Sequence, residues 1–162
     1  MRLGRRALHS AKIAMPQSYE ISTDPARLDV TIIHDFLRAS YWAPDIPREV
    51  VERSLANALC FGAYREGRQI GLARVITDYA TFAYLADVFV LPEHRGQGVA
   101  QALVSAALAD PRLQGLRRWL LATLDAHDLY ARFGFEPLVR PEAFMTIHDP
   151  EVYRRAVAAG RH

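Results

Sequence analysis

Residues 87–101 constrain the fold of this chain most, because an apolar strand pattern runs directly into a glycine-rich turn and then into the start of a helix. Gly96 and Gly98 lack Cβ atoms and tolerate positive φ, so consecutive backbone amides can converge on one group of oxygen atoms. The first amides of a helix have no intrahelical partner and lie at the positive end of the helix dipole. With the charge of Arg95 beside them, these amides predict a binding site for a phosphate group.

Two well-known phosphate-binding loops do not fit this segment. The P-loop requires a Lys followed by Ser or Thr after its last glycine, whereas Val99 and Ala100 follow Gly98 here. The dinucleotide-binding fingerprint requires a third glycine where this chain has Gln101. The loop therefore belongs to neither class.

The segment instead resembles the signature of the GNAT (GCN5-related) acyltransferases, which is Arg or Gln, two residues, Gly, one residue, and then Gly or Ala. Arg95, Gly98 and Ala100 occupy these positions. Residues 125–137 resemble a second element of the same family, a short helix followed by a Leu-Tyr-x-x-x-Gly-Phe segment. The resemblance covers residues 17–140 and implies an α/β (α+β) fold. In that fold a mixed, mostly antiparallel sheet contains one parallel, splayed strand pair and is flanked by helices.

The local patterns agree with a mixed α/β domain. Alternating or continuous apolar runs predict strands, and apolar residues at helical spacing predict helices. Glu66 and Gly67 lie in a turn between two strand patterns and predict a hairpin. The predicted strands are 19–22, 61–65, 69–77, 82–90, 118–122 and, at the end of the chain, 144–148; the predicted helices are 29–39, 47–59, 98–109 and 150–160.

The resemblance implies that acetyl-coenzyme A is the co-substrate. Its diphosphate would lie on the loop, and Val88 and Val90 would lend backbone groups to the pantetheine arm as an added strand does at a sheet edge. Many relatives contact the coenzyme with an Asn where this chain has Thr123, whose hydroxyl can make a similar hydrogen bond. The expected loop contacts come from Arg95, Gly96, Gln97, Gly98, Val99 and Ala100.

Transfer of an acyl group to an amine requires a base for the amine proton and an acid for the departing thiolate. Tyr130 aligns with the family's usual general acid, and its alternative role is packing or hydrogen bonding to the coenzyme. Asp87 is the candidate base, because a carboxylate in an apolar strand is costly unless it is paired or used. Alternation places Asp87 on one face with Leu85 and Phe89, and a structural partnership with an Arg or an amide remains equally open.

Two further residues near Tyr130 have competing interpretations. His127 is a second candidate base by its ordinary pKa, but the start of a helix is also a common place for an exposed His. We expect Asp125 to be the N-cap of the helix that carries Tyr130. The oxyanion donor would be a backbone amide of residues 88–90.

The loop 40–47 holds Tyr41 and Trp42 between the first two predicted helices. In the GNAT fold this segment overhangs the acceptor cleft, so these two aromatics are candidates for substrate contact; packing against the sheet is the alternative. The resulting prediction is an N-acetyltransferase that acts on a primary amine of a small molecule or peptide. A non-catalytic module that binds acyl-coenzyme A as a sensor or scaffold is the alternative function.

Composition excludes several other classes. The chain has 162 residues and 51% hydrophobic content, which suits a single domain over 17–162 after a basic, disordered extension at 1–16. Residues 1–14 carry four basic residues and no acid, which leaves 16 basic against 18 acidic residues elsewhere. A nucleic-acid partner therefore has little electrostatic support, although the extension keeps that alternative open.

Apolar runs, histidines and the single cysteine indicate whether the chain enters a membrane, binds a metal or forms a disulfide. No apolar run approaches the roughly 20 residues that span a bilayer, so we expect no membrane insertion. The six His residues are widely separated, so no metal site is expected. The single Cys60 cannot form an internal disulfide and suits a buried strand. We expect a cytoplasmic protein, and a homodimer is compatible with the resemblance.

Overall fold

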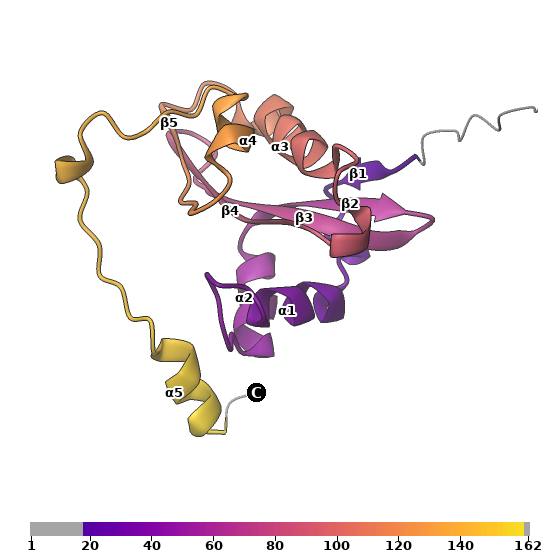
Figure 1. Ribbon diagram of the computed structural model, residues 1–162. Helices are drawn as coiled ribbons and strands as arrows, with labels where there is room; N and C mark the ends of the chain where they lie inside the picture. Colours follow the sequence, from indigo (N-terminus) through magenta and orange to yellow (C-terminus); the bar gives the residue numbers. More distant parts are fainter. Residues whose placement is uncertain (1–17, 161–162) are drawn as a thin grey trace, which may run out of the picture.

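The computed structural model describes residues 18–160, and Figure 1 shows a central sheet with helices on both faces. The basic extension at 1–16, with the nucleic-acid alternative that depends on it, lies outside the described residues. Within 18–160 no helix is long and apolar enough to cross a bilayer. The strands are β1 (Glu20–Ser22), β2 (Leu59–Arg65), β3 (Arg68–Thr77), β4 (Phe82–Val90) and β5 (Arg118–Leu120), and the helices are α1 (Val30–Arg38), α2 (Arg48–Ala56), α3 (Val99–Ala109), α4 (His127–Ala131) and α5 (Val152–Ala158).

The five strands form one sheet in the order β1-β2-β3-β4-β5. All neighbours are antiparallel except β4 and β5, which run parallel from the pair Phe82–Arg118 to the pair Tyr84–Leu120. Beyond Tyr84 the two parallel strands are no longer paired, although β4 continues to Val90. The predicted fold class, including the splayed parallel pair, is therefore confirmed.

Local chemistry explains several boundaries of these elements. The Asp29 carboxylate accepts the amide of Ile32 at 3.0 Å and caps α1. Pro47 precedes α2, where a residue without an N–H costs the helix nothing. Glu66 and Gly67 both have positive φ and form the two-residue turn between β2 and β3. The α2 helix ends at Ala56, three residues before the predicted end, because β2 already begins at Leu59.

The sheet separates two apolar layers. On one face α3 packs through Leu103 and Val104, and on the other α1 and α2 pack through residues such as Ile33 and Val51. Gly71 lies where β3 passes close to β4, since a Cβ there would come within 2.7 Å of the carbonyl oxygen of Phe89. The glycine-rich loop lies between the end of β4 and the start of α3, so both of its ends are held by packed elements.

The prediction of a last strand at 144–148 is wrong. This segment is extended coil that joins no ladder within the described residues, and Met145 and Ile147 are fully exposed. A strand needs a partner for its backbone groups, and here the chain leaves the sheet after α4 and crosses to α5 (Figure 1). Phe144 lies beneath the Arg118 guanidinium, which is 5.2 Å from its ring centroid. The α5 helix begins at Val152 rather than at residue 150.

Cys60 lies in β2 and is only 6% exposed. Burial raises the pKa of its thiol to about 11, and the thiolate is the reactive species. We therefore expect no reaction with a thiol reagent such as Ellman's reagent at neutral pH in the folded protein, and one equivalent of reaction after unfolding in urea. Rapid labelling of the native protein would contradict this burial.

Candidate active site

A β-bulge in β4 changes the direction of the strand at Asp87. Leu72 pairs with Phe89 and Arg74 pairs with Ala86, so two residues of β4 oppose Ala73 alone. Asp87 takes the left-handed conformation, with φ of 49°, which is uncommon for a residue other than Gly. The predicted alternation therefore fails here, because Leu85 packs on the α3 side of the sheet while Phe89 packs on the α1 and α2 side.

Both carboxylate oxygens of Asp87 accept hydrogen bonds. Arg74 Nε donates to Oδ2 at 2.7 Å, and Trp42 Nε1 donates to Oδ1 at 3.0 Å. The side chains of Arg74 and Asp87 are only 14% and 10% exposed, so their ion pair is largely shielded from water. The structural partnership considered for Asp87 is thus present, and the loop aromatic Trp42 is tied to β4 through the same carboxylate.

Removal of Asp87 should unfold the protein more easily. Asp87→Ala leaves the Arg74 guanidinium buried without its partner, and such a loss costs about 3 kcal/mol. The free energy of unfolding in urea measures this change. The double variant Asp87→Asn with Arg74→Met should recover most of the loss, because it removes the buried charge as well; equal instability of the single and double variants would contradict the argument.

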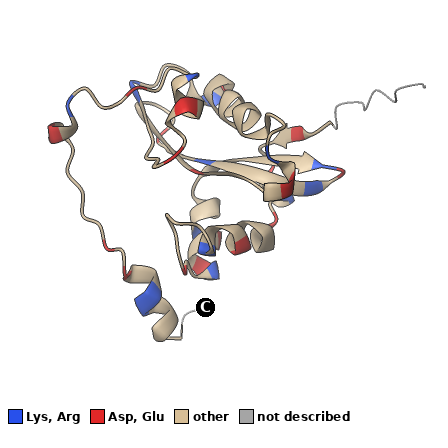
Figure 2. Cartoon of the chain, in the orientation of Figure 1, with Lys and Arg blue, Asp and Glu red and all other residues tan. Residues whose placement is uncertain are grey.

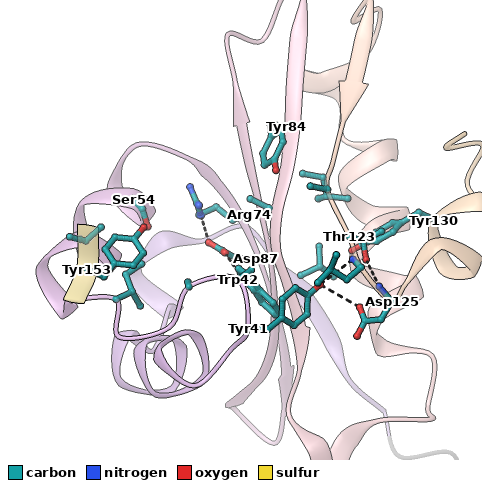
Figure 3. A pocket seen from close by; sticks show the side chains of 18 residues that line it. Tyr41, Trp42, Ser54, Arg74, Tyr84, Asp87, Thr123, Asp125, Tyr130 and Tyr153 are labelled. Carbon is teal, nitrogen blue, oxygen red and sulfur yellow. Dashed lines mark hydrogen bonds and ion pairs between the residues drawn. The ribbon is translucent and has the colours of Figure 1, made fainter. Parts of the chain in front are cut away.

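A cavity of about 440 Å³ opens where β4 and β5 diverge. Its walls come from the loop after α1, from α2, from β3 and β4, from the segment between β5 and α4 and from α4, and one side chain comes from α5 (Figure 3). The lining is mixed, with apolar, aromatic and polar side chains. The residues with functional groups are Tyr41, Trp42, Ser54, Arg74, Tyr84, Asp87, Thr123, Asp125, Tyr130 and Tyr153.

Tyr130 on α4 lines this cavity and is 9% exposed. Burial, with smaller contributions from Tyr41 and Asp125, raises the pKa of its hydroxyl to about 12. The ring of Phe135 packs edge-on against the Tyr130 ring, with centroids 5.9 Å apart. The hydroxyl is therefore protonated at neutral pH and held at the cavity wall as a hydrogen-bond donor.

The start of α4 differs from the prediction at Asp125. The N-cap is Ala126, which makes no side-chain capping hydrogen bond, and the Thr123 hydroxyl oxygen accepts the Ala126 amide at 3.0 Å just before the helix. Asp125 instead lines the cavity, where its Oδ1 accepts the Tyr41 hydroxyl at 3.5 Å. The Tyr41 hydroxyl in turn accepts the Leu124 amide at 3.3 Å. Asp125 is a site residue that its sequence position did not indicate, because an Asp before a helix is usually the N-cap of that helix.

His127 begins α4 and is exposed, and it does not line the cavity. The structure thus places Tyr130, Asp87, Thr123, Tyr41 and Trp42 around one space but leaves His127 outside it.

The glycine-rich loop has the backbone expected of an anion site. Gly96 and Gly98 have φ of 72° and 78°, and α3 begins directly afterwards at Val99. Among residues 18–160 the structure records no acceptor for the amides of Gly98, Val99 and Ala100. Three adjacent donors at the positive end of a helix are therefore available to a phosphate group.

Side chains from other elements hold this loop in place. Arg65 on β2 donates to Gln97 Oε1 at 2.7 Å and contacts His94 Nδ1 at 3.0 Å. Tyr19 donates its hydroxyl to the carbonyl oxygen of Gly98 at 3.2 Å. Tyr19 and Arg65 lie far from the loop in the chain, so no local pattern predicts these contacts.

Val88 and Val90, the two β4 residues predicted to contact the pantetheine arm, lie in different surroundings. Val88 lines the cavity at the splay. The carbonyl oxygen of Val90 accepts Arg95 Nε at 3.1 Å, so this group already serves to position Arg95. The guanidinium of Arg95 is thereby anchored at the end of β4 beside the loop.

Comparison with known proteins agrees with the fold. The model of the acetyltransferase (GNAT) family matches residues 20–135. The protein named "Putative acetyltransferase FG08082" from Gibberella zeae is 36% identical over 137 residues, which span 70% of this chain and 76% of that protein. A crystal structure described as a "putative acetyltransferase belonging to the gnat family" from Xanthomonas campestris pv. campestris is 53% identical. It superposes with a TM-score of 0.82 and covers 84% of this chain and 96% of that one.

The chain therefore belongs to the GNAT family of acetyltransferases. This family implies acyltransferase activity and acetyl-coenzyme A as the acyl donor. Within residues 18–160 no three His, Cys, Asp or Glu side chains lie close enough together to hold a metal ion.

Proposed function

We propose that this protein transfers the acetyl group of acetyl-coenzyme A directly to a primary amine. The observation that carries the proposal is the protonated, buried hydroxyl of Tyr130 in a cavity at the splay of β4 and β5. A structure from Clostridium acetobutylicum, described as a predicted acetyltransferase with acetyl-coenzyme A, shares the fold at 15% identity and a TM-score of 0.60. Its fold supports acetyl-coenzyme A as the donor here.

The donor would lie across the loop and the splay. The amides of Gly98, Val99 and Ala100 and the charge of Arg95 suit the diphosphate. The exposed backbone of β4 near Val88 suits the pantetheine arm, because β5 no longer pairs with β4 there. This path leads the thioester from the loop into the cavity that Tyr130 lines.

In the reaction the ammonium first loses a proton, and the nitrogen lone pair of the neutral amine then attacks the thioester carbonyl carbon. The C–N bond forms and the C–S bond breaks, and the nitrogen releases a second proton. The departing sulfur accepts a hydrogen bond from Tyr130 and ends as the thiol with a proton from this hydroxyl, which regains one from solvent, so one proton is released overall. The pKa of a thiol, about 8.5, lies below the pKa of about 12 of Tyr130, so the proton transfer itself is uphill. We therefore expect the hydrogen bond from Tyr130 to stabilise the sulfur from early in bond cleavage, before the proton is transferred.

Two carboxylates of the cavity are candidates for the first proton transfer. Asp87 is our candidate base, and its two hydrogen bonds fix its orientation toward the cavity. Asp125 is the second carboxylate in the lining. A backbone amide near Val88 would stabilise the oxyanion that forms on the thioester carbonyl oxygen, and this role requires no special side chain.

The test is release of coenzyme A thiol from acetyl-coenzyme A in the presence of a panel of primary amines. Amine-dependent release with formation of the N-acetyl product, identified by mass spectrometry, supports the proposal. Tight binding of acetyl-coenzyme A without release for any amine would instead favour the alternative of a non-catalytic sensor or scaffold.

A further inference from the structure

Resting on the proposed function, we infer that the acceptor is a primary monoamine with an aromatic or apolar body, whose single ammonium group is bound by Asp125. Three features of the cavity carry this inference: its aromatic walls, its charge balance and the position of Asp125 relative to Tyr130.

Besides Tyr130, four aromatic side chains line the cavity. Tyr41 and Trp42 are 52% and 41% exposed, with their rings in an edge contact at 5.0 Å. Tyr84 on β4 and Tyr153 on α5 complete the aromatic lining (Figure 3). An apolar ligand that enters the cavity covers the exposed surface of these aromatic rings and displaces water from it. Burial of this apolar surface stabilises the complex.

Trp42 is also held in one orientation. Its indole N–H donates to Asp87, and its ring lies 6.1 Å from the ring of Phe36. A wall that is fixed before binding loses little side-chain entropy on binding. The aromatic lining is therefore suited to recognition of a flat or compact apolar body.

The charged side chains that line the cavity have a net charge of −1, from one arginine and two aspartates. Arg74, Asp87 and Asp125 are its charged residues, and the first two neutralise each other in an ion pair at 2.7 Å. Among residues 18–160 the Asp125 carboxylate has a single recorded partner, the Tyr41 hydroxyl at a long 3.5 Å, so it can accept an ammonium group. One uncompensated carboxylate matches one ammonium, whereas a polyamine or an aminoglycoside would bring several charges with no partners. In Figure 2 acidic and basic positions are interspersed along the rest of the ribbon.

Asp125 lies near the reaction centre. Its charge contributes to the raised pKa of Tyr130, after burial and Tyr41, so the two side chains interact electrostatically. In Figure 3 Asp125 and Tyr130 lie at one end of the cavity, while Ser54 and Tyr153 lie at the other. An ammonium at Asp125 thus places the nucleophilic nitrogen beside the group that would meet the thioester sulfur, and the body of the amine extends along the aromatic walls.

The experiment compares phenethylamine and tryptamine with spermidine and a lysine-containing peptide in the thiol-release assay. We expect kcat/KM for the two arylalkylamines to exceed that for spermidine and the peptide by at least tenfold. Asp125→Asn should raise the KM for phenethylamine roughly tenfold and leave the Kd for acetyl-coenzyme A unchanged. The matched control is Asp128→Asn, which alters an exposed carboxylate in the first turn of α4 outside the cavity lining and should leave the KM for the amine unchanged.

Calorimetric titration of phenethylamine into the complex with coenzyme A separates this inference from the proposed function. Binding that depends on Asp125, in the absence of turnover, would support the amine site and overturn the transferase. Turnover that is fastest with spermidine or the peptide would leave the transferase standing and overturn the monoamine. An equal KM for phenethylamine in Asp125→Asn and Asp128→Asn would also overturn the assignment of the ammonium site to Asp125.

Discussion

Tyr130→Phe is expected to lower kcat by roughly 100-fold while the Kd for acetyl-coenzyme A stays within a factor of two to three. Removal of a positioned general acid costs on the order of 10²-fold or more. The hydroxyl is expected to contact the sulfur only as the C–S bond breaks, so its loss should affect turnover more than binding. Steady-state thiol release and calorimetric titration measure the two constants separately.

Tyr84→Phe provides the matched control, because Tyr84 lines the same cavity from β4. This variant removes one phenolic hydroxyl from the lining and keeps the ring, so its kcat should remain close to that of the unsubstituted protein. If Tyr130→Phe and Tyr84→Phe turned over equally well, Tyr130 would have no role as an acid.

The pH dependence adds a second criterion for Tyr130. Burial raises the pKa of the hydroxyl to about 12, above its ordinary value of about 10, so the protonated form persists throughout the neutral and mildly alkaline range. Ionisation of Tyr130 therefore should not lower kcat below pH 10. The fall in stability that this group causes should begin near the unfolded pKa and continue through about pH 12, because the unfolded chain releases the proton first.

Gly98→Val is expected to weaken binding of acetyl-coenzyme A by at least tenfold. Gly98 has φ of 78°, a conformation that costs a residue with a Cβ about 1–2 kcal/mol. Relief of that strain would rotate the amides of Gly98 and Val99 away from a shared oxygen cluster. Since 1.4 kcal/mol corresponds to a factor of ten in Kd, a modest loss at this loop is measurable by titration.

Gly67→Val is the control for strain alone. Gly67 has the same φ of 78°, and a Cβ there would meet no atom within 4 Å. It lies in the turn between β2 and β3, so the variant should lose comparable stability and bind acetyl-coenzyme A normally. Equal loss of affinity in both variants would mean that the effect arises from general destabilisation rather than from the loop.

The glycine-rich loop and its helix could be predicted from the sequence because their requirements are local. Positive φ at Gly96 and Gly98 selects glycine directly, and the helical pattern that follows places the free amides. The mostly antiparallel sheet with one parallel strand pair followed from the resemblance to the family, and the structure has both. The local patterns predicted the hairpin and most of the strands, because these depend on short stretches of chain.

Features that depend on distant contacts could not be predicted in the same way. The bulge at Asp87 reverses the alternation within β4, and its partners Arg74 and Trp42 come from another strand and a loop. Asp125 is not the N-cap of α4, which is Ala126, and it lines the cavity instead. The pattern at 144–148 resembled a strand, but a strand exists only where a partner edge is within reach, and that depends on the path of the whole chain.

The decisive measurement is the distance between the Tyr130 hydroxyl oxygen and the thioester sulfur in a crystal structure with bound acetyl-coenzyme A. We expect these two atoms to lie at hydrogen-bonding distance, with the diphosphate on the amides of Gly98, Val99 and Ala100. A sulfur atom remote from Tyr130, or a diphosphate bound away from these amides, would contradict this expectation.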